Sequence, residues 1–493
     1  MGSRFALVLL PFLIPGLSQG QKLKPWETVP QESEAAKRAF PPQLRSELVQ
    51  IRDAALQDDY AYRQLEHLTD SIGPRPTGSP QADAAVHYVA DELRKLGLEV
   101  HLEPVTVTRF LRGNDAAELV EYPGQVPGTT QKIYITALYG NAPTPETRLY
   151  GNAPGPEGIT GEVIVAHDFD ELKALGREKV AGKIVLWDVH YDSRKAAGGR
   201  AGAAYGEAVR YRGVGARAAA ELGAIASVIR SAGDGEFRLP HTGWSTDAHI
   251  PAAAVSAEDA DLMARLASHG PVRLHLSLPT HLGPEVQSYN VVADLKGSEH
   301  PEQVVIVSGH LDSWDLGTGA IDDGAGVVVA METAELLQNL HLHPKRTIRV
   351  IAWMNEEMGA TGRDVYAKDH ASELGNHVAA MESDLGAEHP LGFHAKISEA
   401  AQTQLLPIQN VLSKFGANLL ERVPDSPETD IEPLAEKGVP ALGIWQNGLT
   451  YFKYHHTPAD TLDKVVPEEL RENAACMAVM GYALANMTEP LVK

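Results

Sequence analysis

The sequence predicts an α/β protein, in which a mainly parallel, mixed sheet with helices on both faces is interrupted by a smaller inserted domain. From about residue 286 onward, short apolar strands alternate with helices, which is the pattern of a sheet covered on both sides. Between about 115 and 284 the chain is richer in glycine and alanine and carries short β-like runs. We therefore expect residues 21–114 and 285–493 to build the larger domain and residues 115–284 to form the inserted one.

The composition limits the class of protein. The chain has 493 residues, of which 43% are hydrophobic and 22% charged, as in ordinary globular domains. Its formal net charge of −22 repels phosphate backbones, so we expect no nucleic-acid partner. Cys476 is the only cysteine, which excludes an intramolecular disulfide and a cysteine-based zinc site. Any metal must therefore be held by His, Asp and Glu.

The first 20 residues resemble a secretory signal peptide. Arg4 supplies the positive charge, Phe5 to Ile14 form a short apolar run, and small residues up to Gly20 suit cleavage there. The alternative is a membrane anchor, but the run is too short to cross a bilayer comfortably, and no other segment is apolar enough. We expect an exported protein, secreted or periplasmic, without a membrane span.

Hydrophobic periodicity predicts the elements in chain order. A helix at about 81–96 places Ala85, Val89 and Leu93 on one face, and Gly97 follows as a C-cap. A strand at about 98–108 comes next. The strands of the inserted domain are expected at Lys132–Ala137, Gly161–Ala166, Lys183–Trp187 and Ile225–Arg230. Those of the larger domain are expected at Val304–Ser308, Thr347–Met354, Val378–Glu382 and Pro440–Trp445, with helices at Ala325–Asn339, Thr403–Leu412 and Pro467–Met487.

Two motifs that contain possible metal ligands follow the strand expected at Val304–Ser308. In open α/β sheets, ligands bind beyond the carboxyl ends of the strands. His310 can bind a metal through one ring nitrogen while Asp312 accepts the other N–H and fixes the tautomer. The alternative is a loop histidine beside a turn aspartate. Further on, Asp322 or Asp323 can cap the next helix. Asp322 can instead bridge two cations, because each carboxylate oxygen can serve a different metal.

Three more motifs follow the later strands. Glu357 can bind a metal while its neighbour Glu356 stays free as a base, although a solvated acidic turn is the commoner fate of such a pair. Asp384 follows the third strand of the larger domain. In the last motif His455 and His456 compete as ligands, and spacing alone does not separate them. Taken together, the five motifs supply His, Asp and Glu ligands near strand ends, which predicts a centre for zinc, manganese or cobalt.

At these positions the chain resembles the M28 family of zinc peptidases. The resemblance extends over nearly the whole chain after the signal peptide. Its most specific stretches are Ser308–Gly326 (SGHLDSWDLGTGAIDDGAG), Pro344–Val350 (PKRTIRV), Met381–Asp384 (MESD) and His455–Thr461 (HHTPADT). Earlier matches include Leu68–Ser79 (LTDSIGPRPTGS). The resemblance implies the zinc-exopeptidase fold, with an inserted protease-associated domain at about 115–284 that binds and shields and carries no catalytic residue.

The resemblance also implies two zinc ions per chain. His310 and Asp384 would hold one ion, and Glu357 and His456 would hold the other. Asp322 would bridge the two.

The reaction is implied in the same way. Glu356 would act as the general base, Asp312 would support His310, and a cis peptide bond would follow Asp322. We expect an exopeptidase that cleaves dipeptides or short peptides with a free amino end. The alternatives are an aminopeptidase acting on longer peptides, and glutaminyl cyclase or amide deacylase chemistry on the same fold. A homodimer is expected by analogy with the family. The sequence places no basic residue beside the motifs to bind a substrate carboxylate.

Overall fold

The computed structural model describes residues 32–140, 158–246 and 250–492 of the chain. The predicted signal peptide, residues 1–20, lies outside these described residues. Among the helices that are described, none is both long enough and apolar enough to cross a membrane.

The first sheet has eight strands, and its four central strands, β12, β11, β13 and β16, run parallel. The two strands on one side of this centre and β14 on the other side are antiparallel to their inner neighbours, so the sheet is mixed, as predicted. In spatial order the strands are β1 (Glu99–Leu111), β10 (His281–Leu295), β12 (Arg346–Trp353), β11 (His300–His310), β13 (His377–Glu382), β16 (Ala441–Gln446), β14 (Pro390–Lys396) and β15 (Leu419–Arg422).

Helices cover both faces of this sheet. Alternate side chains of β11 enter different cores, because successive residues of a strand point to opposite faces. Val305 and Val307 pack in the core that contains α10 (Ala325–Asn339) and α16 (Pro467–Asn486). Val304 and Ile306 pack in the core that contains α11 (Thr361–Asp369) and α14 (Glu432–Glu436).

One predicted helix is wrong in detail. The segment expected as a single helix, Thr403–Leu412, is divided between α12 (Glu399–Gln404) and α13 (Leu406–Leu412). Pro407 is tolerated in the first turn of a helix but not in its interior, so a new helix begins just before it. The other helices of this part are α1 (Glu34–Ala39), α2 (Pro42–Ala55), α3 (Tyr60–Glu66), α4 (Pro80–Lys95) and α15 (Tyr451–Tyr454).

A second eight-stranded sheet takes all its strands from residues 116–277. The run expected as one strand at Lys132–Ala137 splits into two short strands, β3 and β4, at opposite ends of the sheet order. In spatial order the strands are β3 (Gln131–Ile133), β2 (Ala116–Glu121), β9 (Arg273–Ser277), β5 (Ile159–Ala166), β6 (Ile184–Trp187), β7 (Ala226–Arg230), β8 (Ala252–Val255) and β4 (Ile135–Ala137). Its helices are α6 (Phe169–Val180), α7 (Ser193–Ala197), α8 (Ala201–Glu221) and α9 (Ala257–Ala267).

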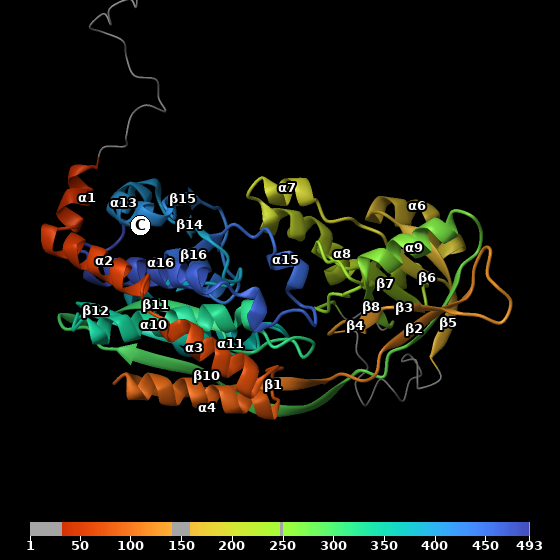
Figure 1. Cartoon of the computed structure of the whole chain (residues 1–493), viewed down its shortest axis with the longest axis horizontal. Coiled ribbons are helices and arrows are strands. Elements are labelled where there is room, and N and C mark those ends of the chain that lie inside the picture. The colour runs from red at the N-terminus through yellow and green to blue at the C-terminus, as the bar shows by residue number, and fades with distance from the viewer. Residues whose placement is uncertain (1–31, 141–157, 247–249, 493) are drawn as a thin grey trace, which may run out of the picture.

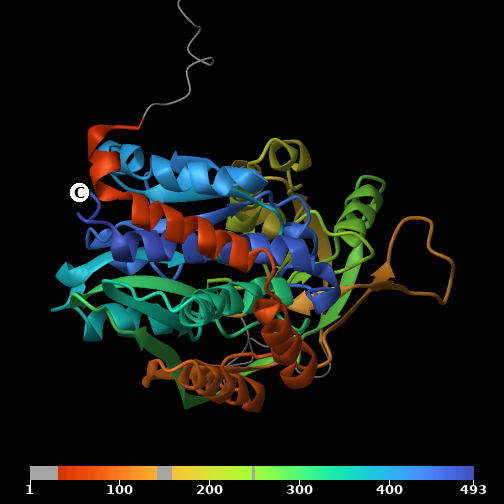
Figure 2. The same cartoon turned by 60° about the vertical axis from the view of Figure 1, so that its left-hand side comes forward.

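The two sheets lie at opposite ends of an elongated molecule (Figure 1). We call the residues that build the second sheet and its helices, 116–277, the second part, and the rest of the described chain the first part. Helix α8 belongs to the second part and α15 to the first, and both lie between the two sheets. Helix α1 and the C-terminal end of the chain lie together at the end remote from the second sheet, and the turned view shows the same arrangement (Figure 2). The two parts therefore face each other across a junction that includes α8 and α15, where Tyr205 stacks on Phe452.

Candidate metal centre

Three neighbouring parallel strands deliver four of the candidate residues to one edge of the first sheet. His310 is the last residue of β11, Glu356 and Glu357 follow β12, and Asp384 follows β13. Strand β11 lies between the other two and is parallel to both. Because the carboxyl ends of parallel strands meet at the same edge, these side chains converge although they are far apart in sequence.

The two aspartates before α10 have different positions. Asp323 precedes the N-cap residue Gly324 and supports the start of the helix: its carboxylate accepts the N–H of Gly326 at 3.0 Å and that of His310 at 2.9 Å. The carboxylate of Asp322 turns instead toward the histidines. The peptide bond between the two aspartates is cis, as the resemblance implied. Asp323 therefore contacts the start of the helix, whereas Asp322 faces the histidines. The sequence alone did not distinguish these two roles.

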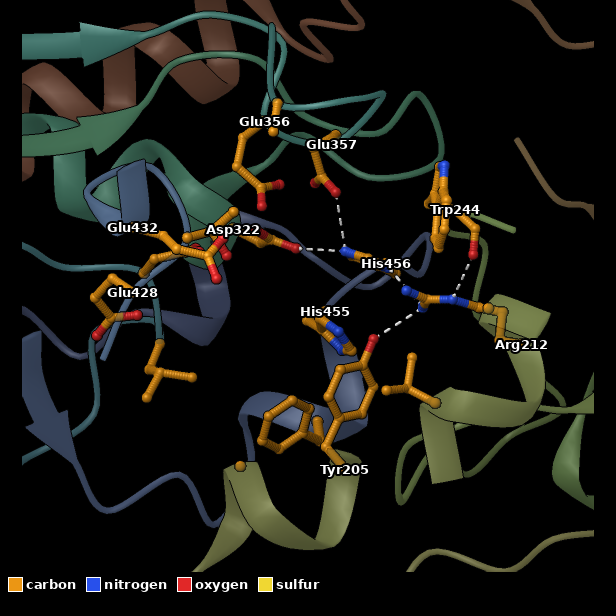
Figure 3. A pocket seen from close by; sticks show the side chains of 18 of the residues that line it. Tyr205, Arg212, Trp244, Asp322, Glu356, Glu357, Glu428, Glu432, His455 and His456 are labelled. Atoms are coloured by element: carbon orange, nitrogen blue, oxygen red, sulfur yellow. Dashed lines mark hydrogen bonds and ion pairs between the residues drawn. The ribbon is translucent and has the colours of Figure 1, made fainter. Parts of the chain in front are cut away.

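The carboxylate of Asp322 divides its two oxygens between two histidines. Its Oδ1 lies 3.1 Å from Nε2 of His310. Its Oδ2 lies 3.1 Å from Nε2 of His456 (Figure 3). A second carboxylate approaches each ring nitrogen, Asp384 at 3.2 Å from His310 and Glu357 at 3.0 Å from His456. Five side chains therefore form two groups of three that share one aspartate.

These groups fit metal ions better than they fit hydrogen bonds. Each Nε2 carries at most one proton, yet two carboxylates converge on it. Asp384 Oδ1 and Asp322 Oδ2 are buried and make no hydrogen bond despite lying this close to a histidine, and Glu357 Oε1 is likewise unpaired. Unpaired buried carboxylate oxygens are costly, so their presence here points to cations as their partners. The donor set of imidazole nitrogen and carboxylate oxygen suits zinc.

The charges at this edge shift each other's protonation. Burial alone would raise the pKa of Asp322, but His310 and His456 hold it well below its usual range. Burial raises the pKa of Glu356 well above its usual range, and Asp384 adds to the effect. Burial and Asp322 together raise the pKa of Glu357 to about 7. The site concentrates negative charge that a bound cation neutralises.

The structure corrects the expected contact of Asp312. The group within hydrogen-bond distance of His310 Nδ1 is the main-chain carbonyl of Asp312, at 3.0 Å, whereas its carboxylate lies 3.9 Å away. The carboxylate accepts the N–H of Asn355 at 2.7 Å and that of Glu356 at 3.1 Å, and the hydroxyl of Thr77 at 2.8 Å. Asp312 therefore orients His310 through its backbone and fixes the glutamate turn through its side chain.

That turn separates the two glutamates. Asn355 has a φ of 73°, in the left-handed region that few residues other than glycine adopt. Glu357 then reaches His456, while Glu356 lies beside it with its carboxylate directed to the cleft (Figure 3). Within the described part of the chain, the carboxylate of Glu356 makes no ion pair or hydrogen bond, so it is free to exchange a proton.

His455 occupies a different environment from His456. Its ring stacks on that of His456 at 4.1 Å between centroids and meets Tyr205 and Phe452 edge-on at 4.9 and 5.0 Å. Burial and the neighbouring His456 hold its pKa well below the usual range. A ring nitrogen of His455 also lies within 4.8 Å of one carboxylate oxygen of Asp322, so proximity alone does not exclude it as a ligand. Its aromatic contacts indicate a packing role.

A cleft of about 960 Å³ opens over the candidate centre. One wall belongs to the first part of the molecule and includes Glu356, Asp384 and Glu428; the other belongs to α8 and the chain after β7 and includes Arg212 and Trp244. Figure 3 shows Glu428 at one end of the cleft and Arg212 at the other. Both are more than nine-tenths buried. Neither carries an ion pair with another described residue.

Sequence reasoning missed both of these cleft residues. Arg212 lies 3.3 Å from His456. The expectation that no basic residue lies beside the metal motifs is therefore wrong in the folded protein. Nothing in its local sequence marks it, because it reaches the centre from another part of the chain. Glu428 gives no signal either, since a single acidic residue after a proline is typical of any surface turn.

Comparisons with known proteins place the chain among peptidases. Residues 290–480 match the model of peptidase family M28. Human carboxypeptidase Q is 36% identical over 437 residues, which cover 87% of this chain and 86% of that protein. The crystal structure of a peptidase M28 precursor from Shewanella amazonensis superposes with a TM-score of 0.82 at 34% identity, covering 92% of this chain and 98% of that one.

A zinc aminopeptidase from Bacillus subtilis shares the fold, with a TM-score of 0.60 at 22% identity and coverage of 88% of this chain and 98% of that one. Fold, site and relatives together define a metallopeptidase. The extent of the identity allows a closer assignment: the chain belongs to peptidase family M28.

The two adjacent histidines provide a first test of the site. We predict that His456→Ala loses metal, because Nε2 of His456 faces both Asp322 and Glu357. His455→Ala should keep its metal, since it removes a ring from an aromatic cluster. Metal analysis of the two purified variants decides between them, and metal loss in His455→Ala alone would show that the assignment is reversed.

Proposed function

We propose that the protein is an exported binuclear zinc exopeptidase that hydrolyses dipeptides or short peptides with a free amino end. The observation that carries the proposal is the carboxylate of Asp322, whose two oxygens each lie 3.1 Å from a different histidine. A carboxylate that serves two histidine–carboxylate groups is the natural bridge between two cations.

In this proposal each ion has two ligands of its own. His310 and Asp384 hold one zinc, Glu357 and His456 hold the other, and Asp322 contributes to both. When bound, zinc supplies Lewis acidity, which lowers the pKa of a nearby water and polarises a carbonyl group. Membership of a family that includes a zinc aminopeptidase of the same fold supports the choice of metal.

Glu356 is the proposed general base. Its carboxylate lines the cleft beside the metal ligands, where a base can reach a water held at the centre. It takes a proton from the attacking water and then delivers it to the amine that leaves when the peptide bond breaks. The N–H of Glu356 is held by the Asp312 carboxylate, which keeps the glutamate turn in place.

The charges of the cleft support a small substrate with free termini. Glu428 provides a buried, unpaired carboxylate for an α-ammonium group at one end, and Arg212 provides a buried guanidinium for a carboxylate at the other. A cleft of about 960 Å³ between two walls admits a short flexible chain and excludes a folded protein. We further infer that residues 115–284 are the inserted protease-associated domain that forms the second wall.

Two alternatives remain to be tested against this proposal. An aminopeptidase would accept longer peptides as readily as dipeptides. A glutaminyl cyclase or amide deacylase would use the same fold for related acyl chemistry, and cyclases of this fold generally work with one zinc. Substrate length and metal stoichiometry therefore discriminate among the three.

Metal content is the first prediction of the binuclear proposal. The purified protein should hold about two zinc equivalents. It should lose its activity in the presence of a chelator, because removing the metal removes the Lewis acid that activates the water. Asp322→Ala should empty both positions, since each group includes this carboxylate. Elemental analysis of the wild type and the variant measures this. Full activity with a single bound metal contradicts the proposal.

The adjacent glutamates should respond differently to the same substitution. Glu356→Gln keeps the size of the side chain but removes the base, so kcat should fall by ~10²–10⁴ while both metals remain. Glu357→Gln removes a ligand, so it should weaken metal binding instead. Metal analysis and steady-state kinetics on both variants provide the measurement, and the opposite pattern would mean that the two roles are exchanged.

Substrate termini give the third prediction. A free dipeptide should be cleaved faster than its N-acetyl form by roughly 10- to 100-fold in kcat/KM, because the acetyl form leaves a buried carboxylate unpaired. Denatured protein should yield no internal cuts. Glu428→Gln should narrow the difference between the free and acetylated dipeptides. Rapid cleavage of the acetylated dipeptide by the wild type would refute the preference for a free amino end.

A further inference from the structure

The second part of the molecule contacts His456 through a reciprocal pair of hydrogen bonds. Thr242, in the chain between β7 and β8, donates its N–H to the carbonyl of His456 at 3.0 Å. Its own carbonyl lies 3.1 Å from Nδ1 of His456. One residue of the second part therefore contacts both the backbone and the ring of this histidine.

The direction of the ring contact follows from the position of the other nitrogen. Nε2 of His456 faces Asp322 and Glu357 and must be unprotonated to bind a cation. The ring proton then resides on Nδ1, which donates to the carbonyl of Thr242. A carbonyl in this position fixes both the tautomer and the orientation of the ring, as outer partners of metal-binding histidines do.

Arg212 holds that carbonyl from the other side. Its Nη1 donates to the carbonyl of Thr242 at 3.2 Å and to the hydroxyl of Tyr205 at 2.8 Å, and its Nε donates to the carbonyl of Trp244 at 3.2 Å. Because Nδ1 of His456 carries a proton, the 3.3 Å approach of Nη1 to it is not a hydrogen bond. Arg212 is 8% exposed as a whole residue, and its guanidinium hydrogen bonds hold it inside the junction.

Further contacts attach Thr242 to both parts of the molecule. Its hydroxyl donates to the carbonyl of Ala137 at 3.0 Å and accepts from Nη2 of Arg112 at 3.0 Å. Nε of Arg112 in turn donates to Asp315 at 2.6 Å, in the loop that follows His310. The carbonyl that contacts His456 is therefore held from several directions.

The backbone of His456 needs such support. Its φ is 59°, in the left-handed region, which costs free energy for a residue with a β-carbon. The N–H of Thr242 holds the carbonyl of this residue, and the stacked rings of Tyr205 and Phe452, 4.4 Å apart, press the preceding helix α15 against α8. The second part therefore contributes contacts to both the ring and the backbone of His456.

We propose that Arg212 and Thr242 are positioning residues for His456, so that the second part of the molecule completes one of the two metal positions as well as covering the cleft. This inference rests on the proposed function, because it takes His456 as a ligand. The position formed by Glu357 and His456 then depends on Arg212, and the position formed by His310 and Asp384 does not.

Zinc binding to the full-length protein tests the claim. Arg212→Met removes the guanidinium but keeps much of the side-chain volume. The variant should keep one zinc at wild-type affinity and bind the other about 10- to 100-fold more weakly, as loss of an outer partner typically does. Titration of the metal-free protein with zinc, against a competing chelator, measures each affinity without relying on activity. Arg212→Lys retains a donor and should restore part of the lost affinity.

Arg210→Met is the matched control. Arg210 lies on the same helix and lines the same cleft, but it is exposed and packs over the rings of Phe169 and Tyr211. It should bind both zinc ions as the wild type does. Thermal unfolding of the metal-free variants detects a general loss of structure, which a positioning role does not require.

The outcomes separate this inference from the proposed function. Two zinc ions bound to Arg212→Met at wild-type affinity overturn the inference alone. Equal weakening of both positions, with a lower unfolding temperature and no recovery in Arg212→Lys, also overturns it, because that pattern belongs to a structural residue. A wild-type protein that binds a single zinc overturns the proposed function and this inference with it.

Discussion

The structure depends on keeping many buried carboxylates close together at one sheet edge. Asp322, Glu357 and Asp384 lie within 3.2 Å of two histidine nitrogens, and several of their oxygens have no hydrogen-bond partner. Burying like charges costs free energy unless cations or donors compensate them. The surrounding architecture can be understood as the scaffold that imposes this crowding at the candidate metal centre.

Part of that scaffold is a buried guanidinium from the N-terminal region. Arg75 is fully buried and donates to the carbonyls of Leu311, Thr318 and Gly319 at 2.7–2.8 Å. These carbonyls belong to the loop that connects His310 to Asp322, so one side chain sets the span between two candidate ligands. This explains why a motif near residue 75, with no ligand of its own, accompanies the metal motifs: the loop lacks regular structure and takes its shape from Arg75.

The sequence was informative where the chemistry is local to a strand end. The alternation of strands and helices along the chain predicted the central sheet. His310, Glu357 and Asp384 each follow a strand of that sheet, which was enough to expect that they converge. Contacts that depend on backbone direction were not predictable: the Asp312 carboxylate was expected on His310 and instead accepts main-chain N–H groups at 355 and 356. Contacts across the junction were also hidden, because no periodicity connects Arg212 to a histidine 244 residues further along the chain.

The same junction links two properties that are usually considered separately. Under the proposed function, substrate size is limited by the distance between the two walls of the cleft. This distance is set where the second part contacts α15 and the loop after it. That loop carries His456, and its backbone and ring are both bound to Thr242. The second wall therefore cannot move away from the first without releasing the contacts that orient this histidine. The restriction on substrate size and the geometry of the candidate centre accordingly depend on one interface, and a change at either side of it affects both.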